Sequence, residues 1–529
     1  MDTVINRYHQ NGNAEKILGA VYTPPRVATA LVRWAVRSPD DKVLDPACGE
    51  GVFLASARTH LANLGSKYPT CLGVDIDPQA ASASLAICSD FFEWAKNCST
   101  RFDAIVGNPP FVRSHLFSET SRAIAFQQME EMGLHPSRLM STWAPFIALS
   151  CKLLAPNGRL AFVVPEEILH VGYAEKLRTF LLKRFRQVTV CLPEDQVFPS
   201  VQQSVILLLC ENKTDEPAGL FTISFGRFEE GPSYATEPAP AWEWHNKWTH
   251  VFLSDWEREA VAEAFSILRW KPLKDYGRVE VGVVTGYNDF FVLPRSKAKQ
   301  ISPKYLTPIV ASARDLKGIR LASSDFTELV EGERPAFLLH TTSPIEKLPK
   351  RVRDYLARGE EMKVNQRFKC RNREPWYGVP SVWPADALLL RQVGEIPKLV
   401  HLSKKCTSTD TIHRVTWLRP SLGRQHTAGF LNTWTLIACE IMGRSYGGGV
   451  LELMPSEANN IPVPPPLPKL ETVFDSVDEA IRGRRFDRAT QLVDNVVISG
   501  LMTRRQQRDA RDILARLIDR RKSKGNGLD

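Results

Sequence analysis

The chain lacks the features that mark disulfide-bonded and zinc-binding proteins. None of its 10 cysteines forms a C-x-x-C pair, and several lie within apolar runs, where a small buried thiol is expected. The spacings among Cys370, His401, Cys406 and His413 match no common zinc-binding pattern. The sequence therefore predicts a protein of a reducing compartment that holds no metal ion.

Long hydrophobic segments and internal repeats are also missing. No apolar run reaches the roughly 18 residues that a membrane-spanning helix needs. The polar N-terminus has no apolar core of a signal peptide. These absences predict a cytoplasmic protein without a membrane partner.

What is present indicates three domains. The 529 residues exceed one ordinary domain. Strands alternate with helices up to about residue 209, which predicts an α/β domain with a parallel sheet and helices on both faces over residues 1–245. A mixed α+β domain is expected over 246–466 and a helical region over 467–529. The net charge of +9 fits a polyanionic partner and equally a solvated basic surface.

A glycine-containing turn follows the first predicted strand. In the segment Val43–Gly51, written VLDPACGEG, an acid ends the strand, and Gly49 and Gly51 flank one residue before a predicted helix. Glycines let the backbone approach a ligand closely, and a helix N-terminus favours a negatively charged ligand group. The turn suits a ligand with a carboxylate, although an ordinary turn between a strand and a helix has the same pattern.

Acidic residues also mark the next two strand ends. Asp75 follows the second predicted strand, and Asp90 stands beside Phe91. In nucleotide-binding α/β folds, an acid at the end of the second strand accepts hydrogen bonds from ribose hydroxyls. Capping of a helix is the structural alternative, for which Asp77 is the better placed residue. Together with Asp45, these acids follow the order expected of a pocket for S-adenosylmethionine (SAM).

A second motif, Asn108-Pro109-Pro110-Phe111, follows the strand that ends at Gly107. The prolines fix the backbone, so that the Asn108 side-chain oxygen and the Pro109 carbonyl oxygen are held as hydrogen-bond acceptors. An aromatic amino group is a poor nucleophile because its lone pair is delocalised, and such acceptors would improve it. The Phe111 ring offers a face on which a base can stack. A turn that only ends the strand is the alternative interpretation.

On these motifs the chain resembles the amino-methylating DNA methyltransferases, in particular the adenine-specific class typified by the TaqI methyltransferase and the Eco57I-type methylases. The resemblance covers residues 17–210 well and residues 273–466 more loosely. The order of the motifs, with the cofactor loop before the catalytic motif, is that of this class. The motif NPPF departs from the commoner NPPY, which removes a hydroxyl group but keeps the stacking ring.

The resemblance implies transfer of the methyl group of SAM to N6 of an adenine that is flipped out of duplex DNA. It assigns Asn108, Pro109, Pro110 and Phe111 to catalysis, and Phe111 and Phe198 to stacking on the target base. The expected contacts to SAM are Tyr22, Thr23, Pro24, Asp45, Pro46, Ala47, Cys48, Gly49, Gly51, Asp75, Ile76, Asp90, Phe91 and Asn108.

Double-stranded DNA is the partner that the resemblance implies, with residues 246–466 as the target-recognition domain. The segment that begins at Val281 resembles the opening of that domain, and basic and aromatic residues alternate between Lys369 and Trp383. A basic helix is expected over 504–524. For both basic segments a solvated face is the alternative. The candidate DNA contacts are Tyr287, Lys369, Arg371, Arg373 and Trp376.

Such an enzyme would be a monomer, associated with the nucleoid through DNA, and would serve as the modification component of a restriction–modification system. The short stretch before Tyr22 is not expected to hold a fused nuclease, and functional pairing with a separate restriction endonuclease is left open by the sequence. The same motif logic serves methylation of RNA adenine and of a glutamine amide in release factors. A DNA-binding protein with an inactive pocket is a further alternative, against which the intact Asp45, Asp75, Asp90 and Asn108 count.

Overall fold

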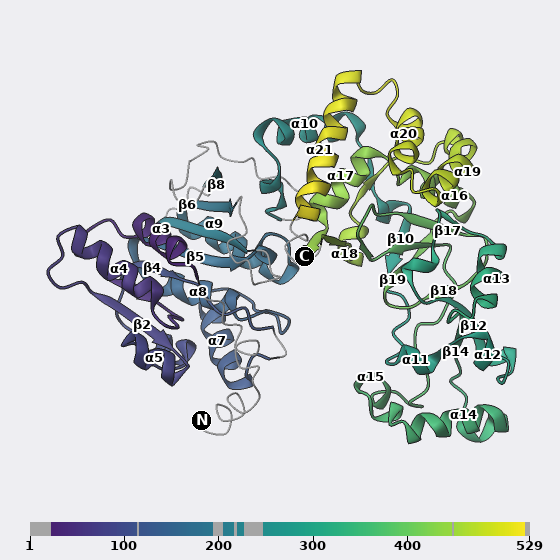
Figure 1. The fold of residues 1–529 in the computed structure, drawn as a ribbon, viewed down its shortest axis with the longest axis horizontal. Helices are drawn as coiled ribbons and strands as arrows, with labels where there is room; N and C mark the ends of the chain where they lie inside the picture. The colour runs from purple at the N-terminus through teal and green to yellow at the C-terminus, as the bar shows by residue number, and fades with distance from the viewer. Residues whose placement is uncertain are drawn as a thin grey trace. The chain divides into compact units, whose positions relative to one another are not determined.

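The computed structural model divides into two compact units, with the boundary between Val251 and Phe252. Each unit is described by itself (Figure 1). The division into domains over 1–245, 246–466 and 467–529 stays a prediction. No helix in the part of the chain that the structure describes is long and apolar enough to cross a membrane. The structure describes residues 23–113, 116–193, 205–215, 220–226, 247–446 and 449–523.

Unit 1 is built on one eight-stranded sheet with the order β3-β2-β1-β4-β5-β7-β6-β8. The first five strands run parallel, and β7 runs antiparallel to both β5 and β6. The strand order reverses at β1, so the loops after β1 and β4 adjoin at the edge where ligands bind in such folds. The strands are β1 (Val43–Asp45), β2 (Cys71–Asp75), β3 (Ile87–Cys88), β4 (Phe102–Gly107), β5 (Leu154–Pro165), β6 (Phe185–Pro193), β7 (Val205–Lys213) and β8 (Leu220–Gly226).

Helices cover both faces of this sheet, as the sequence predicts. On one face, Leu31 and Phe53 from the first two helices join Val106 and other strand residues in a buried apolar cluster. Alternate strand residues such as Ile105 and Phe162 are also buried and face the other side, where α8 packs against β5. The helices are α3 (Pro25–Ala35), α4 (Val52–Asn63), α5 (Pro78–Ser84), α6 (Phe91–Asn97), α7 (Glu119–Glu131), α8 (Trp143–Leu153) and α9 (Glu175–Arg184).

Unit 2 is a mixed α+β structure, as expected for the second half of the chain. It holds a five-stranded sheet (β10-β19-β15-β17-β13), a four-stranded sheet (β11-β14-β12-β18) and two smaller ones. The strands are β9 (Lys271–Pro272), β10 (Gly277–Glu280), β11 (Val292–Leu293), β12 (Leu306–Val310), β13 (Arg320–Leu321), β14 (Phe337–Leu339), β15 (Ala387–Leu390), β16 (Gln392–Val393), β17 (Leu399–Leu402), β18 (Thr407–Ser408), β19 (Ile412–Trp417), β20 (Arg444–Tyr446), β21 (Val450–Glu452) and β22 (Pro462–Val463).

The C-terminal part of unit 2 is helical, which confirms the expectation for that region. There α19 packs against α16 and α20, and α21 packs against α10 and α17 (Figure 1). The helices of the unit are α10 (Asp255–Leu268), α11 (Asn288–Phe291), α12 (Arg295–Ala298), α13 (Ser323–Glu331), α14 (Lys350–Glu361), α15 (Phe368–Arg371), α16 (Gly423–Gly429), α17 (Thr433–Met442), α18 (Pro455–Ala458), α19 (Pro468–Arg482), α20 (Phe486–Val497) and α21 (Arg504–Ser523).

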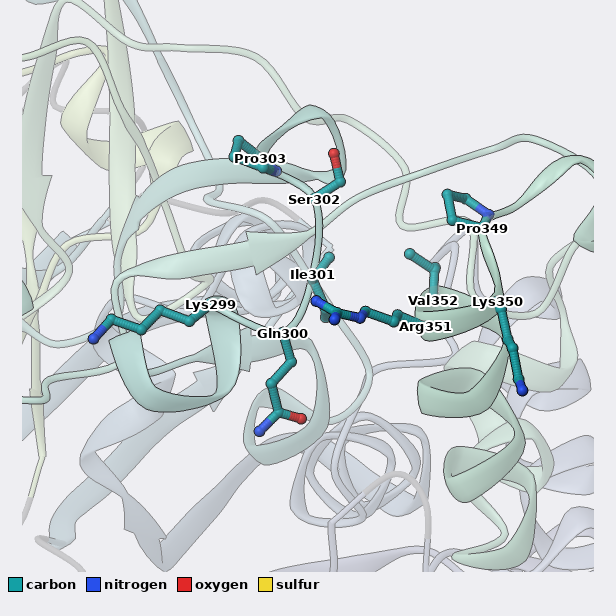
Figure 2. Close-up of a pocket in the computed structure, with 9 residues that line it drawn as sticks. All are labelled: Lys299, Gln300, Ile301, Ser302, Pro303, Pro349, Lys350, Arg351 and Val352. Carbon is teal, nitrogen blue, oxygen red and sulfur yellow. The ribbon is translucent and has the colours of Figure 1, made fainter.

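A hollow of about 460 Å³ opens on unit 2 beside the start of α14 (Figure 2). Three cationic side chains contribute to its wall, and none of the residues predicted for the cofactor or the target base does. We assign it no ligand. Its lining residues are Lys299, Gln300, Ile301, Ser302, Pro303, Pro349, Lys350, Arg351 and Val352.

Candidate active site

The predicted motifs meet at the carboxyl edge of the parallel strands in unit 1. Asp45 ends β1 and Asp75 ends β2, and Asn108 directly follows β4. Because β1 lies between β2 and β4, their loops are neighbours. A Cβ atom added to Gly107 would lie 2.7 Å from Asp45 Oδ1, so the end of β4 and the Asp45 carboxyl are in close contact.

The glycine-containing loop turns sharply from β1 into α4. Gly51 is the residue before the helix and has a φ of +87°, a conformation that glycine adopts without strain. A Cβ atom there would also lie 2.9 Å from Ser84 Cβ. The thiol of Cys48 is buried, 3.5 Å from Ser84 Oγ, and burial raises its pKa to about 12. The Cys48 thiol is therefore a neutral, packed side chain, and its predicted contact to SAM stays a prediction.

Asp75 ties the glycine loop to the end of β2. One of its carboxylate oxygens accepts the N–H of Gly49 at 2.7 Å, and the other accepts the N–H of Asp77 at 2.9 Å. Burial raises the pKa of Asp75, and these hydrogen bonds oppose that shift. Asp77 caps α5 by accepting the N–H of Gln79, so the capping role belongs to Asp77, as the sequence predicts. The next side chain, Ile76, is 52% exposed and offers an apolar surface at the same edge.

Asp45 has the most unusual environment in the site. One oxygen accepts the N–H of Ala47 at 3.2 Å, while the other is buried and meets no hydrogen-bond donor within the described residues. Burial, with a smaller contribution from the charge of Asp75, raises the pKa of Asp45 to about 8. A buried carboxyl oxygen without a donor is costly, and a ligand group that donates a hydrogen bond or carries positive charge would satisfy it. The amino group of SAM has this chemistry.

Asp90 is the N-cap of α6. One carboxylate oxygen accepts the N–H of Phe92 at 2.8 Å, and the other accepts a short hydrogen bond from Ser121 Oγ. The ring of Phe91 is buried and stacks on Phe146 with centroids 4.8 Å apart. Its ring is thus part of the core beneath the sheet edge, and its contact to SAM stays a prediction. Ser121, from α7, was not expected from the sequence because a single hydroxyl carries no local pattern.

The NPPF motif lies in a segment without regular secondary structure after β4. Pro109 is buried, while Asn108, Pro110 and Phe111 are half-buried. The Asn108 amide nitrogen donates to Thr23 Oγ1 at 3.2 Å, which orients the side-chain amide. Thr23 was predicted as a cofactor contact, and the structure places it next to the catalytic motif.

Two of the predicted site residues cannot be placed. Tyr22 and Phe198 lie outside the described residues. Pro24 is described and precedes α3, in which Pro25 is the first residue. Pro46 lies in the turn after β1. The roles of all these residues stay predictions.

The candidate DNA contacts of unit 2 fall into two groups. Arg373 donates to the carbonyl oxygens of Thr285 and Val284 at 2.8 and 2.7 Å, and Trp376 donates to Glu360 at 3.0 Å. Both side chains thus make hydrogen bonds within unit 2. By contrast, Lys369 and Arg371 are exposed, and the ring of Tyr287 lies 3.6 Å beneath the Arg367 guanidinium. Among the described residues, no group of His, Cys, Asp and Glu is arranged to hold a metal ion.

Comparisons with known proteins match both halves of the chain. Residues 3–226 match the model of the N-6 DNA methylases, and residues 245–498 match the C-terminal domain of the type II methyltransferase M.Eco57I. The type II methyltransferase M.AccI of Acinetobacter calcoaceticus is 24% identical over 394 residues, which cover 69% of each chain. M.XamI of Xanthomonas campestris pv. amaranthicola is 24% identical over 84% of this chain and 85% of its own. M.TthHB8I of Thermus thermophilus is 33% identical over 36% of this chain and 44% of its own.

Solved structures agree on the fold. The restriction–modification enzyme MmeI in complex with DNA superposes with a TM-score of 0.55 at 13% identity, over 94% of this chain and 75% of its own. Such identity is informative about fold alone. The family matches confirm the resemblance, the α/β fold and the cofactor predicted from the sequence. The chain belongs to the Eco57I-type N-6 DNA methylases and is a SAM-dependent DNA methyltransferase.

Proposed function

We propose that the protein methylates N6 of adenine at a specific sequence in duplex DNA, as the modification component of a restriction–modification system. One observation carries this proposal. Asp45 has a buried carboxyl oxygen without a hydrogen-bond donor, and it lies at the end of the strand next to the one that leads into the Asn108 motif. The match of the second half to the M.Eco57I C-terminal domain supports DNA over RNA or a release factor as substrate.

The cofactor site is formed by the ends of β1 and β2. Asp45 would hold the amino group of SAM, the loop before α4 would receive its carboxylate near the helix N-terminus, and Asp75 would accept from the ribose hydroxyls. When bound, SAM supplies a methyl group made electrophilic by its sulfonium. The chain must then hold the target amino nitrogen in line with that methyl group.

Asn108 and Pro109 would activate the target amino group. Their oxygens accept its two N–H bonds, which directs the nitrogen lone pair away from the ring and toward the cofactor. No carboxylate base is needed because the proton becomes acidic only as the methyl group arrives, and it can then leave to water. Phe111, which is half-buried beside them, would stack on the base, and Phe198 would pack on its other side.

Several features of this proposal concern partners. A separate restriction endonuclease would cut the same sequence when it is unmethylated. The protein would act as a monomer, because one chain holds both the catalytic unit and the region matched to the M.Eco57I C-terminal domain.

Nucleoside analysis tests the proposal. The purified protein is incubated with SAM labelled in its methyl group and with duplex DNA, RNA or a release-factor protein in parallel reactions. We expect label in N6-methyladenine from DNA alone. Label in cytosine, in RNA or in protein would refute the substrate that we propose.

A further inference from the structure

An exposed aromatic ring surrounded by cations lies at α15 in unit 2. Phe368 is 63% exposed, and Arg367, Lys369 and Arg371 are exposed beside it. Lys369 Nζ and Arg371 Cζ lie 5.7 and 5.4 Å from the centroid of the Phe368 ring. Within the described ranges, none of these three cations forms an ion pair with a carboxylate. We call these four residues the α15 cluster.

The basic helix α21 differs in this respect. Arg516 pairs with Glu257 at 2.5 Å, and Arg521 pairs with Glu440 at 3.0 Å. Much of the charge of α21 is thus neutralised inside unit 2, whereas the charge of the α15 cluster is available to a partner.

The segment that carries the α15 cluster is anchored to the rest of unit 2. Cys370, in the middle of the cluster, is buried, and the Arg373 guanidinium binds two carbonyl oxygens of the segment before Gly286. Arg367 stacks on the Tyr287 ring. The backbone that carries the exposed side chains is therefore anchored to the unit before a partner arrives, which lowers the backbone entropy lost on binding.

We propose that the α15 cluster binds duplex DNA, with the Phe368 ring wedged against a base step and the three cations on the flanking phosphates. Apolar wedges unstack base steps, and neighbouring cations gain free energy by releasing counterions from phosphates. Duplex DNA offers both an apolar base step and the phosphates that flank it. The inference rests on the proposed function and adds Phe368 and Arg367 to its DNA contacts.

The test is to measure the affinity of the protein for an unmethylated duplex that contains its recognition sequence, over a range of salt concentrations. We expect F368A to weaken binding about tenfold with an unchanged salt slope, and R371Q to lower the slope by about 1. R508Q, which removes an exposed charge from α21, is the matched control and should leave the slope unchanged. Wild-type affinity of F368A, or equal slopes for R371Q and R508Q, would overturn the proposal. Failure of the proposed function would show separately, as absence of DNA methylation by the wild-type protein.

A second, independent observation concerns Thr142. Its hydroxyl donates to the Pro110 carbonyl oxygen at 2.5 Å and accepts the Val112 N–H at 3.0 Å, and its own N–H donates to the Val112 carbonyl oxygen at 3.0 Å. These three hydrogen bonds fix the peptide groups on both sides of Phe111.

Thr142 stands on a rigid support. It is the N-cap residue of α8, but its side chain makes no capping hydrogen bond, although that is the usual role of threonine there. Every residue of α8 except Lys152 is buried. The hydroxyl is thus directed to the catalytic segment from a helix that cannot shift without disturbing the core.

We infer that Thr142 is a positioning residue that sets where the Phe111 ring stacks on the target base. Its side-chain hydrogen bonds join it to Pro110 and Val112, so its loss should affect the flipped base and leave SAM binding intact. This inference rests on the proposed function. It gives a role in that function to Thr142, which lies outside the predicted motifs.

Single-turnover methylation by T142V, which lacks the hydroxyl, tests this inference. We expect the rate to fall about tenfold with an unchanged Kd for SAM, and T142S to restore it. A duplex with 2-aminopurine at the target position should fluoresce less with T142V, because fewer bases are held outside the stack. In the double mutant F111A/T142V the effects should not add, since Thr142 acts through Phe111. A wild-type rate for T142V, or additive effects, would overturn the inference, whereas an inactive wild-type protein would refute the proposed function.

Discussion

At the scale of single residues, the site depends on contacts between neighbouring strand ends. Gly107 brings β4 to the Asp45 carboxyl, and Asp75 joins β2 to the glycine loop. Neither contact involves the groups that we propose to react, but both fix the positions of the strand ends that carry those groups. Substitutions at these positions should therefore change activity through geometry.

Gly107→Ala should displace the Asp45 carboxylate, because the added Cβ atom would lie 2.7 Å from its oxygen. We expect SAM binding and methylation to fall about tenfold or more, with a loss of stability of about 1–3 kcal/mol for overpacking. Gly172→Ala is the matched control, because a Cβ atom there meets nothing within 4 Å. Calorimetric titration with SAM measures the effect, and equal SAM affinities for the two variants would contradict it.

The titration of Asp45 predicts a pH dependence. Its pKa is raised to about 8 by burial, so between about pH 4 and 8 the folded chain holds a proton that the unfolded chain has lost. This group therefore makes unit 1 less stable as pH rises through that range. A cationic group of SAM beside Asp45 would favour the carboxylate, so SAM binding should release a proton near pH 7 and tighten toward pH 8. D45N should bind SAM more weakly and with less proton release; equal proton release by both proteins would contradict the assignment.

At the scale of elements, sequence reasoning succeeded where the signal is local. The alternation of strands and helices predicts a parallel sheet with helices on both faces, and the first five strands are parallel, whereas the antiparallel β7 was not predicted. The acids and glycines of the predicted motifs stand directly at strand ends. The contacts of Thr142 and Ser121 were not predicted because each residue contributes one hydroxyl from a helix that is distant in the sequence. No local sequence pattern indicates such a contact. Arg373 and Trp376 stand among exposed cations in the sequence, and only the packing distinguishes their internal hydrogen bonds from surface charge.

The helix α21 illustrates the same limit and leads to a prediction. A run of cations predicts either a DNA-binding or a solvated helix, but Arg521 is almost fully buried and binds Glu440 as well as carbonyl oxygens of neighbouring loops. R521A should lower the free energy of unfolding of unit 2 by about 3–5 kcal/mol, because it leaves a buried carboxylate unpaired. R508A, on the same helix, should change it by less than about 0.5 kcal/mol. Denaturant unfolding measures both, and similar effects would contradict this role.

At the scale of the whole molecule, two compact units each have their own apolar core. Two cores predict two unfolding transitions in calorimetry. SAM should raise the midpoint of one transition, because all of its predicted contacts that the structure describes lie in unit 1, and R521A should lower the midpoint of the other. One transition that responds to both would show that the units unfold together and would contradict this prediction.

The central claim is that the Asn108 motif methylates adenine in DNA. Sequencing that detects modified bases, applied to DNA from cells that express the protein and from cells that express N108A, tests it most directly. N108A should retain SAM binding and lose roughly 10²–10³-fold in rate, as when one preorganised hydrogen-bonding group is removed from other enzymes. We predict N6-methyladenine at one short sequence in cells with the wild-type protein and near-background levels with N108A. Methylcytosine in its place, or equal adenine methylation with both proteins, would contradict the account.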